Sequence, residues 1–258
     1  NEAFVMVDEQ KVAFERILAL SKKAQLDHRK RVIIVEGGPG TGKSVVAVNL
    51  LGRLTKMGQV AQYISKNAAP RTVYESRLAG TFRKSAMSNL FKGTGSFHSE
   101  QKNAFDTLLV DEAHRLNERS GLYGNLGENQ IKEIIHASRC SVFFIDEDQR
   151  IHFKDIGEIE AIREWALLAG AEVEKLELVS QFRCAGSKGY LAWLDDVLGI
   201  RPTANPLLSR SEYKFDVVDS PTRLRNKIIS LNEERNSARI VAGYCWDWKS
   251  KKDAYAMD

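Results

Sequence analysis

An eight-residue segment, GGPGTGKS, constrains the fold of this chain more than any other feature of its sequence. It matches the pattern G-x-x-x-x-G-K-[ST] and lies between a β-branched run at 31–36 and a helical pattern at 43–56, the context that a phosphate-binding loop (P-loop) requires. Glycines let the backbone curl until successive N–H groups point at one phosphate, and the helix adds its positive N-terminal end. We therefore predict that the phosphates of ATP bind to Gly37, Gly38, Pro39, Gly40, Thr41, Gly42, Lys43 and Ser44.

Two carboxylates, Asp111 and Glu112, directly follow an apolar run at 107–110 that is typical of a buried strand. Open parallel sheets bind ligands at the carboxyl ends of their strands, where this pair would lie. Together with the P-loop, the pattern predicts that Ser44 and Asp111 hold Mg²⁺, which prefers oxygen ligands. Lys43 would reach the β- and γ-phosphates, and Glu112 would orient and deprotonate the attacking water.

Three further side chains are candidates for the same site. Gln149 follows an acidic strand end, where its amide can hydrogen-bond both the γ-phosphate and the catalytic water. Arg183 follows another strand, from which a guanidinium can stabilise transition-state charge as an arginine finger does. Gln10 begins a helix, and its amide can bind the N6 and N7 edge of adenine. Taken singly, each residue also fits a plain surface position.

Apolar strand patterns alternate with helical patterns along most of the chain. Short buried strands separated by helices predict an α/β fold: a parallel sheet with helices on both faces and right-handed crossovers. The expected strands are 31–36, 59–64, 107–110, 141–145 and 172–178, and the expected helices include 9–26, 43–56, 130–137 and 159–169.

A change of composition near 201–211 indicates a linker. We predict an ATPase domain over 1–200 and a partial second lobe over 201–258, joined by a helix at 186–198. The second lobe would contain strands at 213–218 and 238–243 around a helix at 221–234.

The overall composition is that of an ordinary soluble globular protein, with 43% apolar and 28% charged residues. A formal net charge of +4 is compatible with nucleic-acid binding but does not require it. The cysteines Cys140, Cys184 and Cys245 lie far apart and lack metal-ligand spacing, which predicts free thiols in a reducing compartment. The sequence has no apolar run long enough to span a membrane and begins without a signal pattern, so we expect a cytoplasmic protein with no membrane partner.

The order of these motifs resembles that of superfamily 1 helicases: Gln10, the P-loop, DEAH at 111–114, Gln149 and Gln181-Phe182-Arg183. More narrowly, the chain is similar to the Schlafen-group-3-like DNA/RNA helicase domain family. The narrower resemblance rests on the P-loop with its continuation Val45–Leu50, on Asn67-Ala68-Ala69 and on Ala242–Trp248, and it covers about residues 4–250. It implies a RecA-like P-loop NTPase fold with the start of a second lobe.

The resemblance also implies roles for individual residues and a partner. Gln10 would contact adenine, Gln149 would couple the γ-phosphate to motion, and Arg183 would touch the γ-phosphate. The segment 59–80, which includes Asn67, corresponds to the part of such enzymes that binds a nucleic-acid backbone, so single-stranded DNA or RNA is the expected partner. A basic loop at 81–103 either contributes to that contact or is a plain solvated surface; its candidates are Arg83, Lys84, Lys92 and His98.

The implied function is ATP binding and hydrolysis coupled to DNA or RNA, as in a helicase or translocase. Such enzymes have two RecA-like lobes, and the motifs of the second lobe are not found here, so we expect a fragment of a longer protein. An alternative is an ATP-dependent switch, in which loops at 81–103 and 117–129 dock a protein partner with little hydrolysis. A further alternative is a P-loop kinase, which would have no need for a water-activating Glu112.

Overall fold

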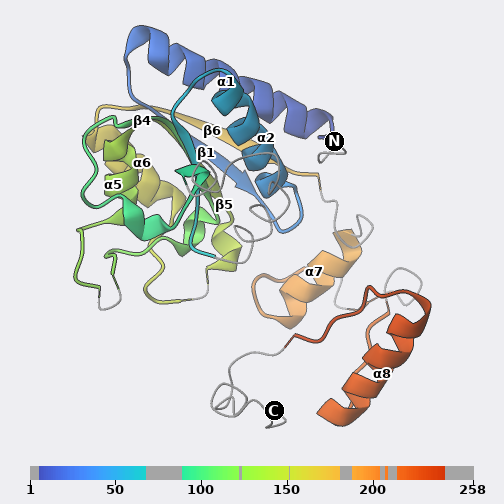
Figure 1. Cartoon of the computed structure of the whole chain (residues 1–258). Coiled ribbons are helices and arrows are strands. Elements are labelled where there is room, and N and C mark those ends of the chain that lie inside the picture. The colour runs from blue at the N-terminus through green and yellow to red at the C-terminus, as the bar shows by residue number, and fades with distance from the viewer. Residues whose placement is uncertain are drawn as a thin grey trace. The chain divides into compact units, whose positions relative to one another are not determined.

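The structure is a computed structural model of the 258-residue chain (Figure 1). It describes residues 6–67, 89–121, 124–150, 152–180, 188–203, 207–208 and 214–241. The chain divides into two compact units, Asn1–Leu208 and Ser209–Asp258, and each is described by itself. The ATPase domain over 1–200 and the partial second lobe over 201–258 stay predictions, because compactness alone does not define a functional domain.

The first unit contains a six-stranded parallel sheet. In their order along the sheet, the strands are β3 (Phe91–Lys92), β2 (Ala61–Ser65), β4 (Phe105–Asp111), β5 (Ser138–Ile145), β1 (Arg31–Gly37) and β6 (Glu172–Leu178). Because every pairing is parallel, the carboxyl ends of all the strands meet at one edge of the sheet. β5 lies between β1 and β4, so one strand separates the P-loop strand from the strand that ends in Asp111.

Helices cover both faces of this sheet, as the sequence predicted (Figure 1). α1 (Asp8–Asp27) and α2 (Lys43–Lys56) pack on one face, and α5 (Gln130–Ala137) and α6 (Ile159–Leu168) pack on the other. Successive strand residues point to opposite faces, so Ile33 joins the core under α1 and α2 while Ile34 joins the core under α5 and α6. The fold is therefore a three-layer α/β architecture of RecA-like P-loop type.

One strand was missed within the segment expected to be the loop 81–103. β3 pairs with β2 through Tyr63 opposite Phe91, and their rings lie 5.6 Å apart, centroid to centroid. A two-residue strand has no periodicity of its own, because it exists only through pairing with a neighbour.

α7 (Lys188–Val197) ends the helical part of the first unit, within the predicted helix at 186–198. In the second unit, α8 (Pro221–Glu234) begins at Ser220, whose hydroxyl accepts a hydrogen bond from the N–H of Arg223 at 3.3 Å. The strands predicted on either side of α8 were wrong where residues are described, because 214–218 and 238–241 have no regular structure. These residues find no neighbouring strand within the described part of the unit, and an unpaired strand is not stable in water.

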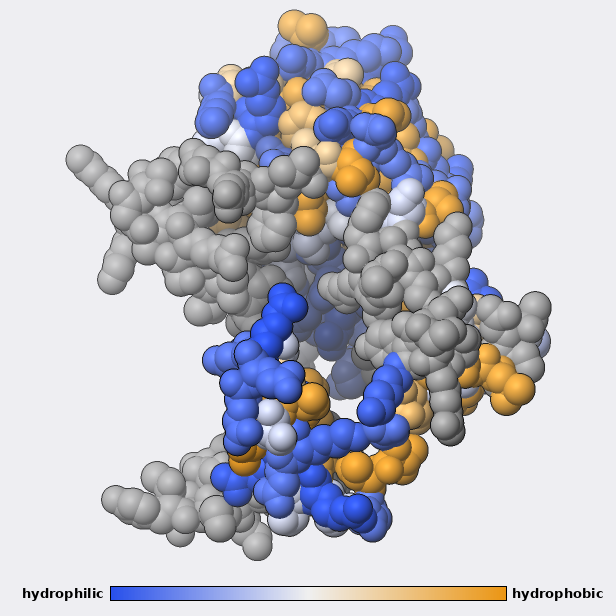
Figure 2. All heavy atoms as spheres, turned by 90° about the vertical axis from the view of Figure 1, so that its right-hand side faces the viewer, coloured by the Kyte–Doolittle hydropathy of each residue, from blue (hydrophilic) through white to orange (hydrophobic). Residues whose placement is uncertain are grey.

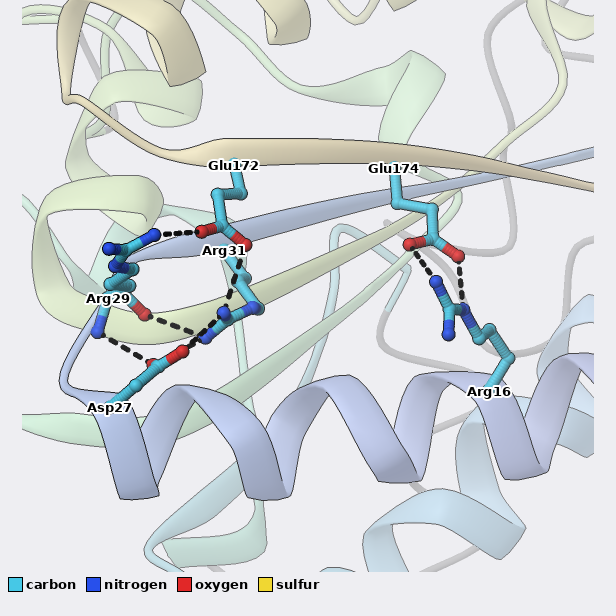
Figure 3. Close-up of polar contacts among 6 residues, drawn as sticks. All are labelled: Arg16, Asp27, Arg29, Arg31, Glu172 and Glu174. Atoms are coloured by element: carbon cyan, nitrogen blue, oxygen red, sulfur yellow. Dashed lines mark hydrogen bonds and ion pairs between the residues drawn. The ribbon is translucent and has the colours of Figure 1, made fainter.

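A buried arginine joins α1 to two strands at the amino ends of β1 and β6 (Figure 3). The Arg31 side chain, only 2% exposed, makes ion pairs with Asp27 at 2.6 Å and with Glu172 at 2.9 Å. Arg29 contacts Glu172 from solvent at 3.1 Å. The hydrogen bond from Arg31 lowers the pKa of Asp27, and that from Arg29 lowers the pKa of Glu172. These four residues, the Arg31 cluster, stay ionised at neutral pH.

Two further contacts strengthen the same side of the unit. Arg16 on α1 donates to Glu174 on β6 at 2.7 Å, which adds a second link between helix and strand (Figure 3). Lys30 donates to the carbonyl groups of Ile135, at 2.6 Å, and Ser138. These carbonyls lie at the carboxyl end of α5, where backbone acceptors lack partners within the helix, so Lys30 acts as a cap.

Apolar side chains at the surface are dispersed. Figure 2 shows the hydrophobic residues of one face as separate patches among hydrophilic ones. Examples of exposed apolar residues are Val12 and Leu26 on α1. Among the described helices, none has the length and the continuous apolar character needed to cross a bilayer.

Candidate nucleotide site

The P-loop forms a tight curl between β1 and α2. Gly40 and Gly42 have φ angles of 80° and 88°, a region that side chains with a Cβ rarely adopt. The Thr41 hydroxyl donates to the Gly38 carbonyl at 3.0 Å and closes the curl from inside. Gly42 is also the residue before the first turn of α2, so the positive end of that helix faces the loop. The loop therefore has the conformation that phosphate binding requires.

Gln10 on α1 supports this loop from behind. Its side chain is buried, with Nε2 donating to the Thr41 carbonyl at 2.9 Å and Oε1 accepting from the N–H of Val7 at 3.2 Å. A Cβ on Gly42 would lie 2.1 Å from Gln10 Nε2, so only glycine fits opposite this amide. Both ends of the amide are occupied by protein, and the adenine contact expected of Gln10 stays a prediction.

Lys43 is directed into its own loop. Its Nζ donates to the carbonyl groups of Gly37 and, at 2.8 Å, Gly38. The same Nζ lies 3.7 Å from Asp146 Oδ2, immediately beyond the end of β5. An ammonium group in this place can bind phosphate oxygens once it leaves the backbone carbonyls.

Asp111 forms the centre of a buried hydrogen-bond cluster at the end of β4. Its Oδ2 accepts hydrogen bonds from the hydroxyls of Ser44, at 2.6 Å, and Tyr63, at 2.5 Å. Its Oδ1 accepts from the N–H of Glu112 at 3.0 Å. The Ser44 hydroxyl and the Asp111 carboxylate are hard oxygen donors of the kind Mg²⁺ prefers, so these two residues could hold that ion. Within the described ranges, no group of three or more His, Cys, Asp or Glu side chains could hold a metal, so phosphates and waters would supply the other ligands.

Glu112 adopts a left-handed backbone conformation, with φ of 52°, directly after the strand. Its Oε2 accepts a hydrogen bond from Asn67 Nδ2 at 2.5 Å. Burial and the neighbouring Asp111 raise the pKa of Glu112, and the Asn67 contact opposes that rise. A carboxylate with a raised pKa suits a group that must accept a proton during catalysis.

The end of β5 places Asp146 and Gln149 between the P-loop and Asp111. Gln149 Nε2 donates to Asp146 Oδ2 at 2.7 Å. Burial raises the pKa of Asp146, while the nearby Lys43 lowers it. Sequence reasoning named Gln149 but gave no separate role to Asp146, although its place as the first residue after a buried strand is a usable signal.

His114 and the Lys66–Asp155 pair are buried polar groups that the sequence analysis did not assign. His114 is 2% exposed, and its Nδ1 has no partner among the described residues. Burial, followed by Lys43 and Arg115, lowers the pKa of His114 to about 4, so the ring is neutral at neutral pH. The Lys66 ammonium lies 3.1 Å from the fully buried carboxylate of Asp155.

A cavity of about 530 Å³ lies beside this pair, in the segment that follows β5. Its walls include Arg150, His152, Phe153, Asp155 and Ile156. Phe153 is fully exposed, although it is the kind of side chain that usually packs inside. An exposed aromatic ring beside an arginine and a histidine is suited to a planar, anionic ligand.

Some predicted site residues lie outside the described residues: Arg183, Arg83, Lys84 and the Ala242–Trp248 phrase. The strand that leads toward Arg183 ends in a defined place, because Glu9 on α1 accepts the N–H groups of Val179, at 3.0 Å, and Ser180, at 2.9 Å. Lys92 lies on β3, and the exposed His98 contacts the carbonyl of Gly95 at 3.2 Å. The structure thus brings Lys43, Ser44, Asp111, Glu112 and Gln149 together at one edge of the sheet.

Proteins of known sequence resemble the chain over different lengths. An uncharacterized protein of Saccharomyces cerevisiae is 22% identical over 286 residues, which cover 96% of this chain and 63% of that protein. RecA of Oleidesulfovibrio alaskensis is 27% identical over 137 residues, which cover 46% of this chain and 39% of RecA. The chain therefore spans less than two thirds of the length of either relative.

Solved structures give weaker likenesses. Domain III of the replication initiation protein DnaA from Thermotoga maritima aligns with a TM-score of 0.36 and 15% identity, covering 93% of this chain and 90% of that one. DnaA of Aquifex aeolicus, bound to AMPPCP, aligns with a TM-score of 0.33 and 13% identity, covering 90% and 66%. TM-scores below 0.5 do not establish a shared fold, so the fold assignment rests on the sheet order described above.

The match to a protein family is more extensive. The family described as "Schlafen group 3, DNA/RNA helicase domain" matches residues 30–258, which include the P-loop, Asp111 and the strand ends on either side of it. The resemblance inferred from the motifs is thereby confirmed. The chain belongs to the Schlafen group 3 DNA/RNA helicase domain family.

Proposed function

We propose that this chain is an ATP-binding and ATP-hydrolysing motor domain of helicase or translocase type, acting on single-stranded DNA or RNA. The observation that carries the proposal is the meeting of three strand ends. β1 brings Lys43 and Ser44, β4 brings Asp111 and Glu112, and β5 brings Gln149 to the same edge. This edge is where open parallel sheets bind their ligands.

The residues divide the work of hydrolysis. Lys43 exchanges the carbonyls of Gly37 and Gly38 for the β- and γ-phosphate oxygens. Ser44 and Asp111 separate to hold Mg²⁺, which when bound would neutralise charge on the phosphate oxygens. Glu112 accepts a proton from water as the water oxygen bonds to the γ-phosphorus, and the bond from that phosphorus to the ADP oxygen breaks.

Two candidate residues complete this account. Gln149, released from Asp146, would contact the γ-phosphate and signal its presence to the segment that follows β5. Arg183 would place its guanidinium on the charge that develops in the transition state. Gln10 would fix the P-loop and contact adenine, which requires its Nε2 to leave the Thr41 carbonyl.

The nucleic-acid partner is supported by the family and by the cavity after β5. Phe153 offers a base-sized exposed ring, and Arg150 and His152 offer donors for phosphate or base edges. A base that stacks on an aromatic side chain gains about 1–3 kcal/mol whatever its sequence, which suits a motor that moves along a strand. The relative shares of Phe153 and of the loop 81–103 in binding are part of the proposal.

A second candidate is the ATP-dependent switch that binds a protein partner. It is favoured by a built loop at this end of the unit, where Ser120 and Leu126 exchange backbone hydrogen bonds of 2.8 and 3.0 Å. Leu126 is exposed on that loop and could meet a partner. The switch needs ATP binding, but it needs neither Glu112 nor a polymer for its action.

The deciding experiment measures ATP hydrolysis with and without single-stranded DNA and RNA. We expect hydrolysis that rises with one polymer, disappears in Lys43→Ala and survives in Lys22→Ala, since Lys22 is exposed on α1. ATP binding that depends on Lys43, without stimulation by either polymer, would favour the switch. No ATP binding at all would refute both.

A further inference from the structure

Two consecutive residues after β2 connect different parts of the first unit. Asn67 Nδ2 donates to Glu112 Oε2 at 2.5 Å. The preceding Lys66 donates through Nζ to Asp155 Oδ1 at 3.1 Å and to Asn117 Oδ1 at 3.0 Å. The sequence analysis expected Asn67 in the nucleic-acid-binding segment, yet here its amide is directed to a carboxylate of the nucleotide site.

The contact from Asn67 affects how Glu112 ionises. Burial and the adjacent carboxylate of Asp111 both favour the protonated form of Glu112, which cannot act as a base. A donor on Oε2 favours the ionised form and also fixes which oxygen remains available to water. Asn67 thus influences both the charge and the direction of Glu112.

The contact from Lys66 connects the end of β2 to the cavity after β5. Asp155 lines that cavity, and its Oδ2 accepts the N–H of His152 at 3.1 Å while its Oδ1 accepts from Lys66. Although burial acts to raise it, the hydrogen bonds from Lys66 and His152 hold the pKa of Asp155 below its usual value. An ionised, fully buried carboxylate that has lost its cation is costly, so Lys66 and the cavity wall stay together.

We propose that Lys66 and Asn67 are positioning residues that link the cavity beside Phe153 to Glu112. Asn67 keeps Glu112 ionised and oriented, and Lys66 fixes Asn67 by anchoring the end of β2 to Asp155. The inference rests on the proposed function, because it takes Glu112 as the base and single-stranded nucleic acid as the occupant of the cavity. A strand that contacts His152 and Phe153 then changes the geometry of Glu112 through Asp155, Lys66 and Asn67.

The first test does not require hydrolysis. The carboxyl ¹³C signal of Glu112, assigned by its loss in Glu112→Gln, is titrated in the nucleotide-free chain by nuclear magnetic resonance. We expect the pKa of Glu112 to rise in Asn67→Ala and to rise less in Lys66→Met. Asn89→Ala and Lys22→Met change the same residue types at exposed positions and are expected to leave it unchanged. An unchanged pKa in Asn67→Ala overturns the role of Asn67.

The second test is kinetic and concerns the link to the cavity. Asn67→Ala should lower kcat for ATP by about 10- to 100-fold, a usual cost of misplacing a catalytic group, with little change in KM. Its acid limb in the pH–rate profile should move to higher pH, which a loss of folded protein alone would not cause. Lys66→Met should lose most of the stimulation by nucleic acid, while Lys66→Arg, which keeps the cation beside Asp155, should retain it.

The outcomes separate this inference from the function on which it rests. A wild-type chain that no polymer stimulates contradicts the proposed function, while the titration still decides whether Asn67 controls Glu112. Stimulation that persists undiminished in Lys66→Met overturns the link between the cavity and Glu112.

Discussion

The two ends of the parallel sheet hold their ionisable groups in opposite ways. At the carboxyl end, burial raises the pKa values of Glu112 and Asp146. At the amino end, hydrogen bonds from arginines lower the pKa values of Asp27 and Glu172. Groups of the first kind are held at an energetic cost that folding alone does not explain, whereas groups of the second kind contribute to stability. The direction of a pKa shift thus separates the end that would do chemistry from the end that holds the unit together.

The largest expected effect tests the carboxyl end. Glu112→Gln should reduce ATP hydrolysis by about 100- to 10,000-fold, because the amide cannot accept the proton of water. ATP affinity, measured with a fluorescent nucleotide, should stay close to that of the wild type, since Lys43 and Ser44 remain. A variant that hydrolyses ATP normally would remove Glu112 from the chemistry and favour the switch.

The next effect tests the amino end. Arg31→Met should lower the free energy of unfolding by about 1–3 kcal/mol, less than for a fully buried pair because Asp27 and Glu172 keep some contact with water. Urea unfolding measures the loss, and ATP affinity of the folded variant should be unchanged. The contrast between the two ends would fail if Arg31→Met weakened ATP binding while Lys43→Met destabilised the fold.

Acid should affect the two ends differently. The folded-state pKa of Glu112 is raised, so hydrolysis should fall at a pH above the ordinary glutamate range. In that range the protonation of Glu112 and Asp146 stabilises the folded chain, because their folded-state pKa values exceed the unfolded ones. Asp27 and Glu172 have lowered pKa values, so their stabilisation persists above the unfolded-state pKa and is lost only below it.

A pH–rate profile compared with melting temperatures over the same range checks this separation. Activity should be lost while the melting temperature is still unchanged or slightly raised. A common midpoint for both would mean that acid inactivates the chain by unfolding it.

The smallest expected effect compares two glycines of the same helix region. Gly52 lies on an exposed turn of α2 with open space where a Cβ would stand, so Gly52→Ala should raise the free energy of unfolding by about 0.5–1 kcal/mol. ATPase activity should not change. Gly42→Ala has the opposite geometry, with a positive φ and Gln10 in the way, and should lose ATP binding.

Much of this architecture was predictable because it depends on local patterns. The P-loop lies where its spacing places it, and the helices 43–56 and 130–137 were predicted with the same limits as α2 and α5. Apolar runs such as 141–145 correspond to buried strands, since a strand covered on both faces must be apolar throughout. The amphipathic pattern of α1 likewise follows from its one buried face.

The remaining features depend on contacts between distant segments. Tyr63 meets Asp111, and Lys66 meets Asp155, only because β2 and β4 pair in one register and the segment after β5 returns to them. No local pattern encodes that register. The strands expected at 213–218 and 238–243 were wrong at their described residues for the same reason, because strand propensity without a partner strand has no effect.

The position of β5 in the middle of the sheet also governs when the molecule can form. β1 hydrogen-bonds only to β5 and β6 among the described strands, so Arg31 finds its neighbours in Cys140 and Glu172. As the chain leaves the ribosome, the segment that leads into the P-loop has no strand to pair with until Ile145 has been made. During that interval a short apolar β-branched segment is exposed, which favours aggregation and binding by chaperones. Slow, late assembly of the first unit is thus built into the order of its strands.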